Sequence, residues 1–310
     1  MSKGSISIAL GGGGARGIAH LGVLRFFEEE KIVPSFIAGT SMGAVIGAMY
    51  ARYRDTVEIE ERIANLVKSD FMHKTGLDSY ASSNADFQKR GLDYVFNRLR
   101  QNIHLARVFT RAGSISADIL LEAMEFLIDD IDITELSIPF CAVATDLSNG
   151  KPVFFRSGPV RQAITASASI PGVFAPFEYN GMKLVDGAAS YLTPVPPAKE
   201  FGNTPVIAVD VSKSIENLPF PHRGYGVFFR SGDIAMINYN ALLLGQADIV
   251  IRPDVAGINW ADFYSYPALI EKGNIAARAK LAEIHAILLR DCSFFQRWWG
   301  KRAQKTGTSQ

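Results

Sequence analysis

Four consecutive glycines, Gly11–Gly14, stand in the stretch LGGGGARGIAHLGVL at residues 10–24. An apolar run precedes them, and the residues that follow have the spacing of an amphipathic helix. Glycine loses more conformational freedom on folding than any other residue. A run of four therefore indicates that this loop needs backbone groups that no side chain shields. Such a loop aims a row of N–H groups at an anion, which is either a bound phosphate or an oxyanion formed during a reaction. The sequence therefore predicts a strand, a tight anion-binding loop and a helix.

Strand and helix patterns alternate along most of the chain. Apolar runs typical of short strands lie at residues 6–10, 36–38, 140–144, 183–185 and 206–211, and a hairpin is predicted to join 140–144 to 153–155. Helical patterns follow the first two strands, at residues 18–31 and 44–53. This alternation is typical of an α/β fold with a largely parallel sheet. Residues 55–135 are mostly helical and polar in pattern, so we expect one domain with a helical insertion that covers one end of the sheet.

Composition narrows the class of protein. The 310 residues are 48% hydrophobic and 20% charged, which is typical of a globular chain. A net charge of +1 provides no field that would attract nucleic acid. The two cysteines, Cys141 and Cys292, argue against a disulfide framework and favour a reducing compartment. The apolar run at 6–10 is too short for a signal peptide, and no apolar stretch reaches the roughly 18 residues of a membrane span, so we expect a cytoplasmic protein, soluble or peripheral on the inner face of the membrane.

The glycine loop also contains the pattern G-x-G-x-x-G, formed by Gly12, Gly14 and Gly17 between a strand and a helix. As a dinucleotide fingerprint, it would require an acidic residue about 20 positions on, at the end of the second strand. Residues 39–41 are Gly-Thr-Ser instead. A Walker phosphate loop is excluded because no Gly-Lys-Ser/Thr follows the glycines. Nucleotide binding remains the alternative function, and a tight turn without a ligand remains the structural alternative.

Ser41 lies in a second motif, Gly39-x-Ser41-x-Gly43, between a predicted strand and a helix. This is the pattern of a nucleophile elbow, in which small neighbours let a strained turn present the serine hydroxyl. The same residues also fit a serine that caps the following helix. In adjacent strand–helix units of a parallel sheet, both turns open at the same edge. We therefore expect the N–H groups of the glycine loop to face the Ser41 hydroxyl.

A serine hydroxyl needs a base to take its proton. None of the five histidines lies at a strand end with a turn signature, so we expect surface or capping roles for His20, His73, His104, His222 and His285. Asp186 is the better candidate, because in LVDGA at residues 184–188 an apolar strand ends in a carboxylate and Gly187 permits a sharp turn. An isolated Asp-Gly pair is most often only a turn. The small, proline-punctuated stretch at residues 166–176 is consistent with a tight wall around a site.

Taken in order, the motifs Gly-Gly-Gly-x-Arg-Gly, Gly-x-Ser-x-Gly and Asp-Gly-Ala resemble those of the patatin-like phospholipase family, and residues 144–147 and 169–174 are similar to segments of its bacterial members. The resemblance covers about residues 5–212 and continues faintly through residues 247–253. It implies a three-layer α/β fold with a mainly parallel sheet, helices on both faces and a helical insertion. It also implies a Ser-Asp acyl hydrolase that needs no histidine, metal or cofactor.

The resemblance assigns a role to each motif residue. Ser41 would attack the ester carbonyl and form an acyl-enzyme, and Asp186 would assist its deprotonation and later activate water. The N–H groups of Gly12, Gly13 and Gly14 would donate to the oxyanion. Arg16 matches the basic position of the family, where it would either steady the loop or attract a phosphate head group. The expected substrates are membrane phospholipids or lysophospholipids, with acyl transfer to an acceptor other than water as a variant of the reaction.

Two positions depart from the usual bacterial pattern. Ala188 follows Gly187 where a second glycine is more common, and Leu192-Thr193 precede Pro194 where an asparagine is more usual. The second departure leaves open what braces the loop after Asp186.

Residues 213–310 form a C-terminal extension that we expect to pack on the same domain. Residues 294–302 combine aromatic and cationic side chains, which suits an anionic bilayer surface, and residues 219–229 are a second candidate for lipid contact. Filling of a groove or a dimer interface is the alternative for the first segment, and ordinary core packing for the second. The sequence leaves the head-group preference and the oligomeric state open.

Overall fold

The computed structural model describes residues 5–70, 115–213, 215, 220–221 and 224–289. Its centre is an eight-stranded sheet whose strands pair in the order β5-β6-β3-β2-β1-β7-β8, with β4 paired to β3. Pairing is parallel from β3 through β2, β1 and β7 to β8, and antiparallel at β4, β5 and β6. The strands are β1 (Ser7–Leu10), β2 (Phe36–Thr40), β3 (Phe140–Asp146), β4 (Pro152–Phe155), β5 (Phe177–Tyr179), β6 (Met182–Asp186), β7 (Val206–Val209) and β8 (Ile249–Ile251). The predicted α/β class with a mainly parallel sheet is confirmed.

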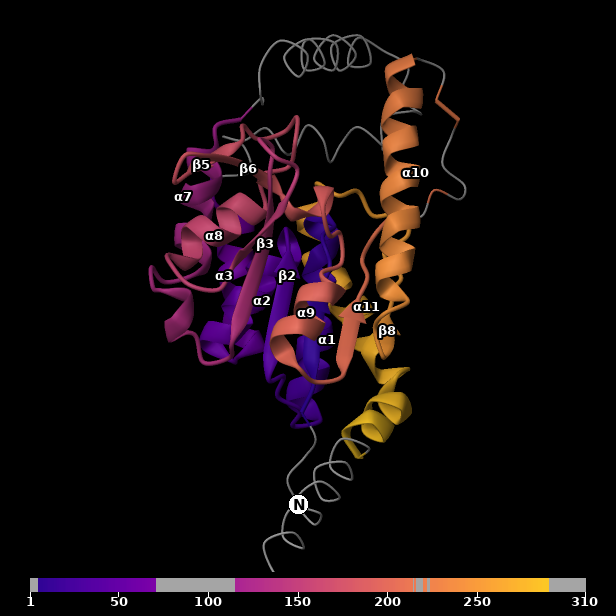
Figure 1. Cartoon of the computed structure of the whole chain (residues 1–310). Helices are drawn as coiled ribbons and strands as arrows, with labels where there is room; N and C mark the ends of the chain where they lie inside the picture. The colour runs from indigo at the N-terminus through magenta and orange to yellow at the C-terminus, as the bar shows by residue number, and fades with distance from the viewer. Residues whose placement is uncertain (1–4, 71–114, 214, 216–219, 222–223, 290–310) are drawn as a thin grey trace, which may run out of the picture.

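Helices cover both faces of the sheet, as Figure 1 shows. Alternate residues of β1 point to opposite faces, so Ile8 and Leu10 lie in a larger core with α1, α2, α3, α7, α8 and α11, whereas Ala9 lies in a smaller core with α9 and the end of α10. The helices are α1 (Ala19–Glu29), α2 (Met42–Tyr53), α3 (Thr56–Lys68), α7 (Ala117–Leu127), α8 (Val160–Ser167), α9 (Val195–Gly202), α10 (Gly224–Leu244) and α11 (Tyr266–Arg278). The three-layer arrangement is confirmed.

The predicted insertion is described only at its two ends, α3 and α7, which pack with α2 in the larger core. Beyond residue 212, β8 pairs with β7 at the edge of the same sheet, and α11 packs closely along α1. A Cβ at Gly22 or at Gly273 would overlap a backbone carbonyl oxygen of the facing helix, so these glycines permit the close approach. Several predicted features lie outside the described residues, namely the aromatic and cationic segment at 294–302, Pro219, His73, His104, His222 and Cys292.

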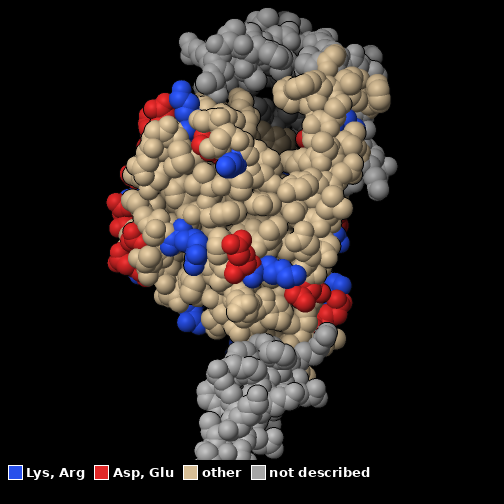
Figure 2. Space-filling model, viewed as in Figure 1, with Lys and Arg blue, Asp and Glu red and all other residues tan. Residues whose placement is uncertain are grey.

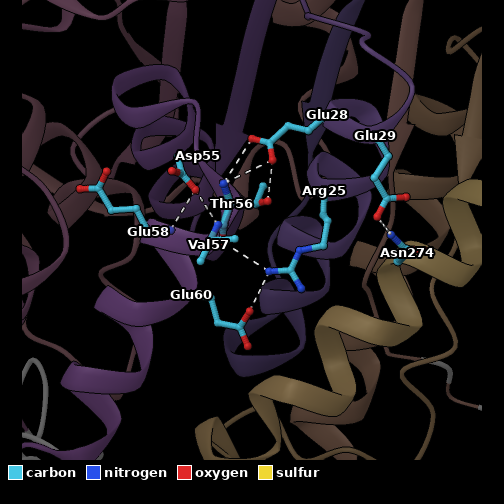
Figure 3. Close-up of polar contacts among 9 residues, drawn as sticks. All are labelled: Arg25, Glu28, Glu29, Asp55, Thr56, Val57, Glu58, Glu60 and Asn274. Atoms are coloured by element: carbon cyan, nitrogen blue, oxygen red, sulfur yellow. Dashed lines mark hydrogen bonds and ion pairs between the residues drawn. The ribbon is translucent and has the colours of Figure 1, made fainter.

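A polar network fixes α3 against α1, as Figure 3 shows. The carboxylate of Glu28 accepts hydrogen bonds from the Thr56 hydroxyl (2.6 Å) and backbone N–H (3.2 Å), while Arg25 donates to Glu60 at 2.7 Å. Asp55 caps α3 by accepting from the first-turn N–H groups of Val57 and Glu58. These partly exposed pairs contribute little one by one, but together they set where α3 lies.

The helix α10 is packed differently from the others. It stands beside the body of the protein in Figure 1, and Figure 2 shows fewer charged side chains on its surface than on the rest of that face. Its exposed large apolar side chains are Val227, Phe228, Phe229, Ile234, Tyr239 and Leu242. In the described parts of the chain, no helix, α10 included, combines the length and the apolarity that crossing a bilayer requires.

Candidate active site

Ser41 occupies a strained turn between β2 and α2. Its φ of 55° and ψ of −127° lie in a region that residues with a side chain rarely adopt, which is characteristic of functional turns. The flanking glycines allow this turn because a Cβ at Gly39 would overlap Ala44, and a Cβ at Gly43 would overlap the carbonyl oxygen of Leu10. The Ser41 side chain makes no capping hydrogen bond to α2. The capping alternative is therefore wrong, and the hydroxyl is left for another partner.

The ends of two strands bring Ser41 and Asp186 together. Val143 of β3 pairs with both β2 and β4, and Ala144 pairs with both β4 and β6. A strand has only two edges, and β4 occupies one edge of β3 opposite both β2 and β6. The strands β2 and β6 therefore share the other edge of β3, where they run toward each other. Thr40 is the partner of Val143, and Asp186 is the partner of Ala144, so the two strands end at adjacent positions. Each strand thus delivers its polar residue to the same point.

The end of α8 and the residues just after it hold both residues by their backbones. The N–H of Ser41 donates to the Ser167 hydroxyl at 2.9 Å, and that hydroxyl donates to the Val143 carbonyl oxygen at 2.6 Å. The N–H of Asp186 donates to the carbonyl oxygen of Ser169 at 2.9 Å. The stretch predicted as a tight wall therefore anchors both sides of the site. Individual roles for Ser167 and Ser169 were missed, because only their small size marked them in the sequence.

Asp186 is buried, with 4% of its surface exposed, and burial raises its pKa to about 6. Hydrogen bonds from the Ser41 side chain and from the N–H of Ala188 (2.8 Å) oppose this shift because they stabilise the carboxylate. A carboxylate with a pKa near 6 is ionised at neutral pH and is a stronger base than an exposed aspartate. It is suited to accepting a proton from the serine.

The glycine loop lies directly beside Ser41, since a Cβ at Gly12 would come within 3.3 Å of the Ser41 Cβ. The N–H of Gly12 donates to the carbonyl oxygen of Leu192 at 2.8 Å. The N–H groups of Gly13 and Gly14 meet no acceptor among the described residues. Gly12 therefore cannot donate to an oxyanion without breaking its own hydrogen bond, and we restrict the predicted oxyanion donors to Gly13 and Gly14.

A family model for the patatin-like phospholipases matches residues 8–199, which include the glycine loop, Ser41 and Asp186. The chain belongs to the patatin-like phospholipase family. An uncharacterized NTE family protein from Mycobacterium tuberculosis is 35% identical over 207 residues, which are 67% of this chain and 48% of that protein. A protein named lysophospholipase nte1, from Aspergillus terreus, is 31% identical over 229 residues, which are 72% of this chain and 13% of that protein. The chain thus matches about half the length of the mycobacterial relatives.

Solved structures resemble the chain at low sequence identity. VipD from Legionella pneumophila has a TM-score of 0.44 and 12% identity, covering 91% of this chain and 67% of that one. Human GIVD cytosolic phospholipase A2 has a TM-score of 0.47 and 12% identity, covering 93% of this chain and 59% of that one.

In this member of the family, Arg16 and His20 both hold the glycine loop. The Arg16 Nε donates to the carbonyl oxygen of Gly13 at 3.2 Å. Burial lowers the pKa of Arg16, whereas the nearby carboxylates of Asp210 and Asp233 raise it. These contacts support the loop-steadying role of Arg16.

His20 is fully buried, and burial lowers its pKa to about 4, so the ring is neutral. Its Nε2 lies 2.7 Å from the carbonyl oxygen of Gly11, which can only accept, so Nε2 carries the proton. The surface or capping role predicted for His20 is wrong. Its apolar neighbours Ala19 and Leu21 were the available signal in the sequence.

An apolar cavity of about 30 Å³ adjoins the site. It lies between η1 (Gly14–Ile18), which begins in the glycine loop, α2, which follows Ser41, and the helices α3 and α7. Its walls are Ile18, Met42, Val45, Ile46, Ile63, Leu66, Val67, Leu127 and Phe263. A wholly apolar cavity of this kind favours an alkyl group over water. In the part of the chain that the structure describes, no cluster of His, Cys, Asp or Glu side chains could hold a metal ion.

Proposed function

We propose that this protein is a serine acyl hydrolase that cleaves fatty-acyl ester bonds of phospholipids or lysophospholipids. The observation that carries the proposal is the Ser41 side chain hydrogen-bonded to a buried Asp186, with the glycine loop directly beside Ser41 at Gly12. The family match and the name of the fungal relative, a lysophospholipase, support lipid esters as the substrate class. They favour acyl hydrolysis over the nucleotide-binding alternative.

The reaction would proceed in two steps. The Ser41 Oγ attacks the ester carbonyl carbon while its proton passes to Asp186, and the carbonyl oxygen becomes an oxyanion facing Gly13 and Gly14. Collapse of this intermediate releases the alcohol, which takes the proton from Asp186, and leaves the acyl group on Ser41. Asp186 then takes a proton from water as the water oxygen attacks the acyl-enzyme, and it passes this proton to the Ser41 Oγ when the acyl–Oγ bond breaks and the fatty acid is released.

The surroundings of Ser41 suit an apolar acyl group. Met42, the next residue, and Ile18, at the end of η1, both line the apolar cavity, so the elements that carry the nucleophile and the oxyanion donors also form its walls. We propose that the acyl chain leaves Ser41 past Met42 and that its first methylene groups enter this cavity, whose volume of about 30 Å³ holds no more than these. A phosphate head group would remain on the side of Arg16.

We also propose that the protein contacts membranes peripherally through α10. The side chains of Phe228 and Phe229 are 75% and 50% exposed, and Phe220 just before the helix is 75% exposed. In Figure 1 the upper end of α10 projects beyond the sheet, and Figure 2 shows a hollow between this end and the body. A cluster of exposed apolar side chains such as this marks an interaction site. Of the possible partners, a lipid surface would also present the substrate.

The decisive experiment is intact-mass analysis after treatment with an alkyl fluorophosphonate, followed by assay of fatty-acid release from lysophosphatidylcholine. We expect one adduct on the wild type, none on Ser41→Ala, and slower labelling of Asp186→Asn. Ser148→Ala, which changes an exposed serine, is the matched control and should label like the wild type. An unlabelled wild type in the presence of lipid, or an adduct that persists on Ser41→Ala, would overturn the proposal.

A further inference from the structure

One polar side chain is buried where α10 meets the rest of the protein. Among the described side chains of α10, only Asn240, Leu243 and Leu244 are buried, and Asn240 is 2% exposed. Burial of an amide is unfavourable unless its polar atoms are hydrogen-bonded, and a third leucine would complete the apolar contact. Packing alone therefore does not account for asparagine at this position.

Asn240 connects α10 to two other segments. Its Oδ1 accepts a hydrogen bond from the backbone N–H of Thr193 at 3.0 Å, in the loop that follows Asp186. Its Nδ2 faces Asp210 Oδ1 at 3.5 Å, just beyond the end of β7. Asp210 also accepts from the N–H of Ser212 at 3.1 Å. The amide thus lies between the loop after Asp186 and a fixed carboxylate at the edge of the site.

The segment held by Asn240 lies against the glycine loop. The carbonyl oxygen of Leu192, next to Thr193, accepts the N–H of Gly12 at 2.8 Å. A Cβ at Gly11 would come within 2.9 Å of the Thr193 Oγ1. A shift of residues 192–193 would therefore move the glycine loop, and with it the N–H groups that follow Gly12.

We propose that Asn240 is a positioning residue for catalysis, which holds residues 187–194 so that Asp186 and the glycine loop keep their places around Ser41. The inference rests on the proposed hydrolase activity. It adds that this activity requires α10, which contributes Asn240.

The test compares Asn240→Leu with Asn238→Leu, which makes the same change at an exposed position of α10. Turnover of a soluble short-chain p-nitrophenyl ester separates catalysis from membrane binding. Misplaced reacting groups lower kcat, so we expect kcat of Asn240→Leu to fall about 10- to 100-fold with KM little changed. Asn238→Leu should match the wild type. Equal kcat values for the two leucine variants would overturn the inference.

A second variant keeps the test valid if Asn240→Leu folds poorly. With Arg252→Gln as the control for the ion pair that Asp210 makes with Arg252 at 3.3 Å, the double change Asn240→Asp with Asp210→Asn exchanges the amide and the carboxylate, so the acceptor for the Thr193 N–H and the net charge are both kept. We expect it to retain kcat within about threefold of the wild type. A loss as large as that of Asn240→Leu would show that the hydrogen bond is not what matters, and would also overturn the inference.

Hydrogen exchange gives a readout that does not depend on activity. In Asn240→Leu, peptides covering residues 187–194 and 11–16 should exchange faster than in Asn238→Leu, whereas peptides of α1 should be unchanged. Unchanged exchange in both loops would contradict the positioning role even if the protein turned over no ester at all. Failure of the inference is thereby distinguished from failure of the proposed function.

Discussion

Two helices of this protein each carry a pair of adjacent phenylalanines, and the two pairs have opposite surroundings. Phe26 and Phe27 of α1 are fully buried, with ring centroids 6.1 Å apart. Phe228 and Phe229 of α10 have centroids 5.9 Å apart but are 75% and 50% exposed. Both pairs are Phe-Phe within an α-helix, so neither the dipeptide nor the helical conformation determines whether the rings are buried.

The difference lies in what surrounds each helix. The α1 helix packs between the sheet and α11, with α3 alongside, so adjacent residues on different sides of the helix are both covered. Among the described residues of α10, side chains are buried only near its C-terminal end, and Asp233 farther up pairs with Lys213. Apolar residues in α1 therefore stabilise the fold, whereas those at the N-terminal end of α10 remain available for another surface. Each prediction below contrasts the same residue type at two positions with different surroundings.

The largest effect is expected for the phenylalanine pairs themselves. Phe27→Ala removes a fully buried ring and should lower the free energy of unfolding by about 4 kcal/mol. Phe229→Ala should change it by less than about 0.5 kcal/mol. Urea denaturation followed by circular dichroism measures both. Equal destabilisation by the two substitutions would break the comparison, because it would mean that α10 is packed as tightly as α1.

The next effect concerns a buried and a more exposed aspartate. The pKa of Asp186 is about 6 in the folded protein, above its ordinary value of 3.8, so its ionisation disfavours folding at pH above 6. Asp186→Asn removes this penalty and should stabilise the protein by up to about 3 kcal/mol above pH 6. The gain should shrink as the pH falls from 6 to 3.8 and vanish well below 3.8, where the carboxyl group is neutral in both states.

Asp233→Asn in α10 is the control for this effect, because Asp233 pairs with Lys213 and is more exposed. It should give no stabilisation at any pH. Thermal melting of both variants between pH 4 and 8 provides the comparison. The same ionisation should shape catalysis, with the esterase rate of the wild type falling as pH drops below about 6, since a protonated Asp186 cannot accept a proton from Ser41. A flat pH–rate profile between pH 5 and 7 would contradict the assignment.

A smaller effect is expected for lipid binding. Burying a phenylalanine side chain in the acyl region contributes roughly 2 kcal/mol, so Phe228→Ser should weaken binding to phosphatidylcholine vesicles at least about 10-fold. Phe126→Ser, at a 46% exposed phenylalanine of α7, should leave vesicle binding unchanged. Vesicle flotation measures both. If Phe228→Ser floats like the wild type, α10 is not the membrane contact.

The smallest effect concerns two valines of the same helix. Val67 of α3 lines the apolar cavity, and Val57 at the other end of α3 is 60% exposed. Val67→Phe should fill the cavity and lower kcat/KM for butyrate and longer p-nitrophenyl esters about 10-fold, with the acetate ester little affected. Val57→Phe should change neither. An unchanged chain-length profile in Val67→Phe would show that the acyl chain lies elsewhere.

The sequence determined the elements of this protein and the residues that stand at their ends. The glycine run, the Gly-x-Ser-x-Gly turn and the strand that ends in Asp186 are local patterns, because strand and turn preferences act over a few residues. Their order along the chain was enough to indicate the family and the α/β fold.

Only the tertiary structure decided which of these groups meet and which stay available. The end-to-end approach of β2 and β6, the bond that occupies the Gly12 N–H, the burial of His20 and the contact of Asn240 with Thr193 all join residues from separate elements. The register of the sheet and the packing of helices on it fix such contacts, and neither is encoded in a short stretch of sequence. For the same reason two Phe-Phe pairs that look alike in the sequence have opposite positions in the folded protein.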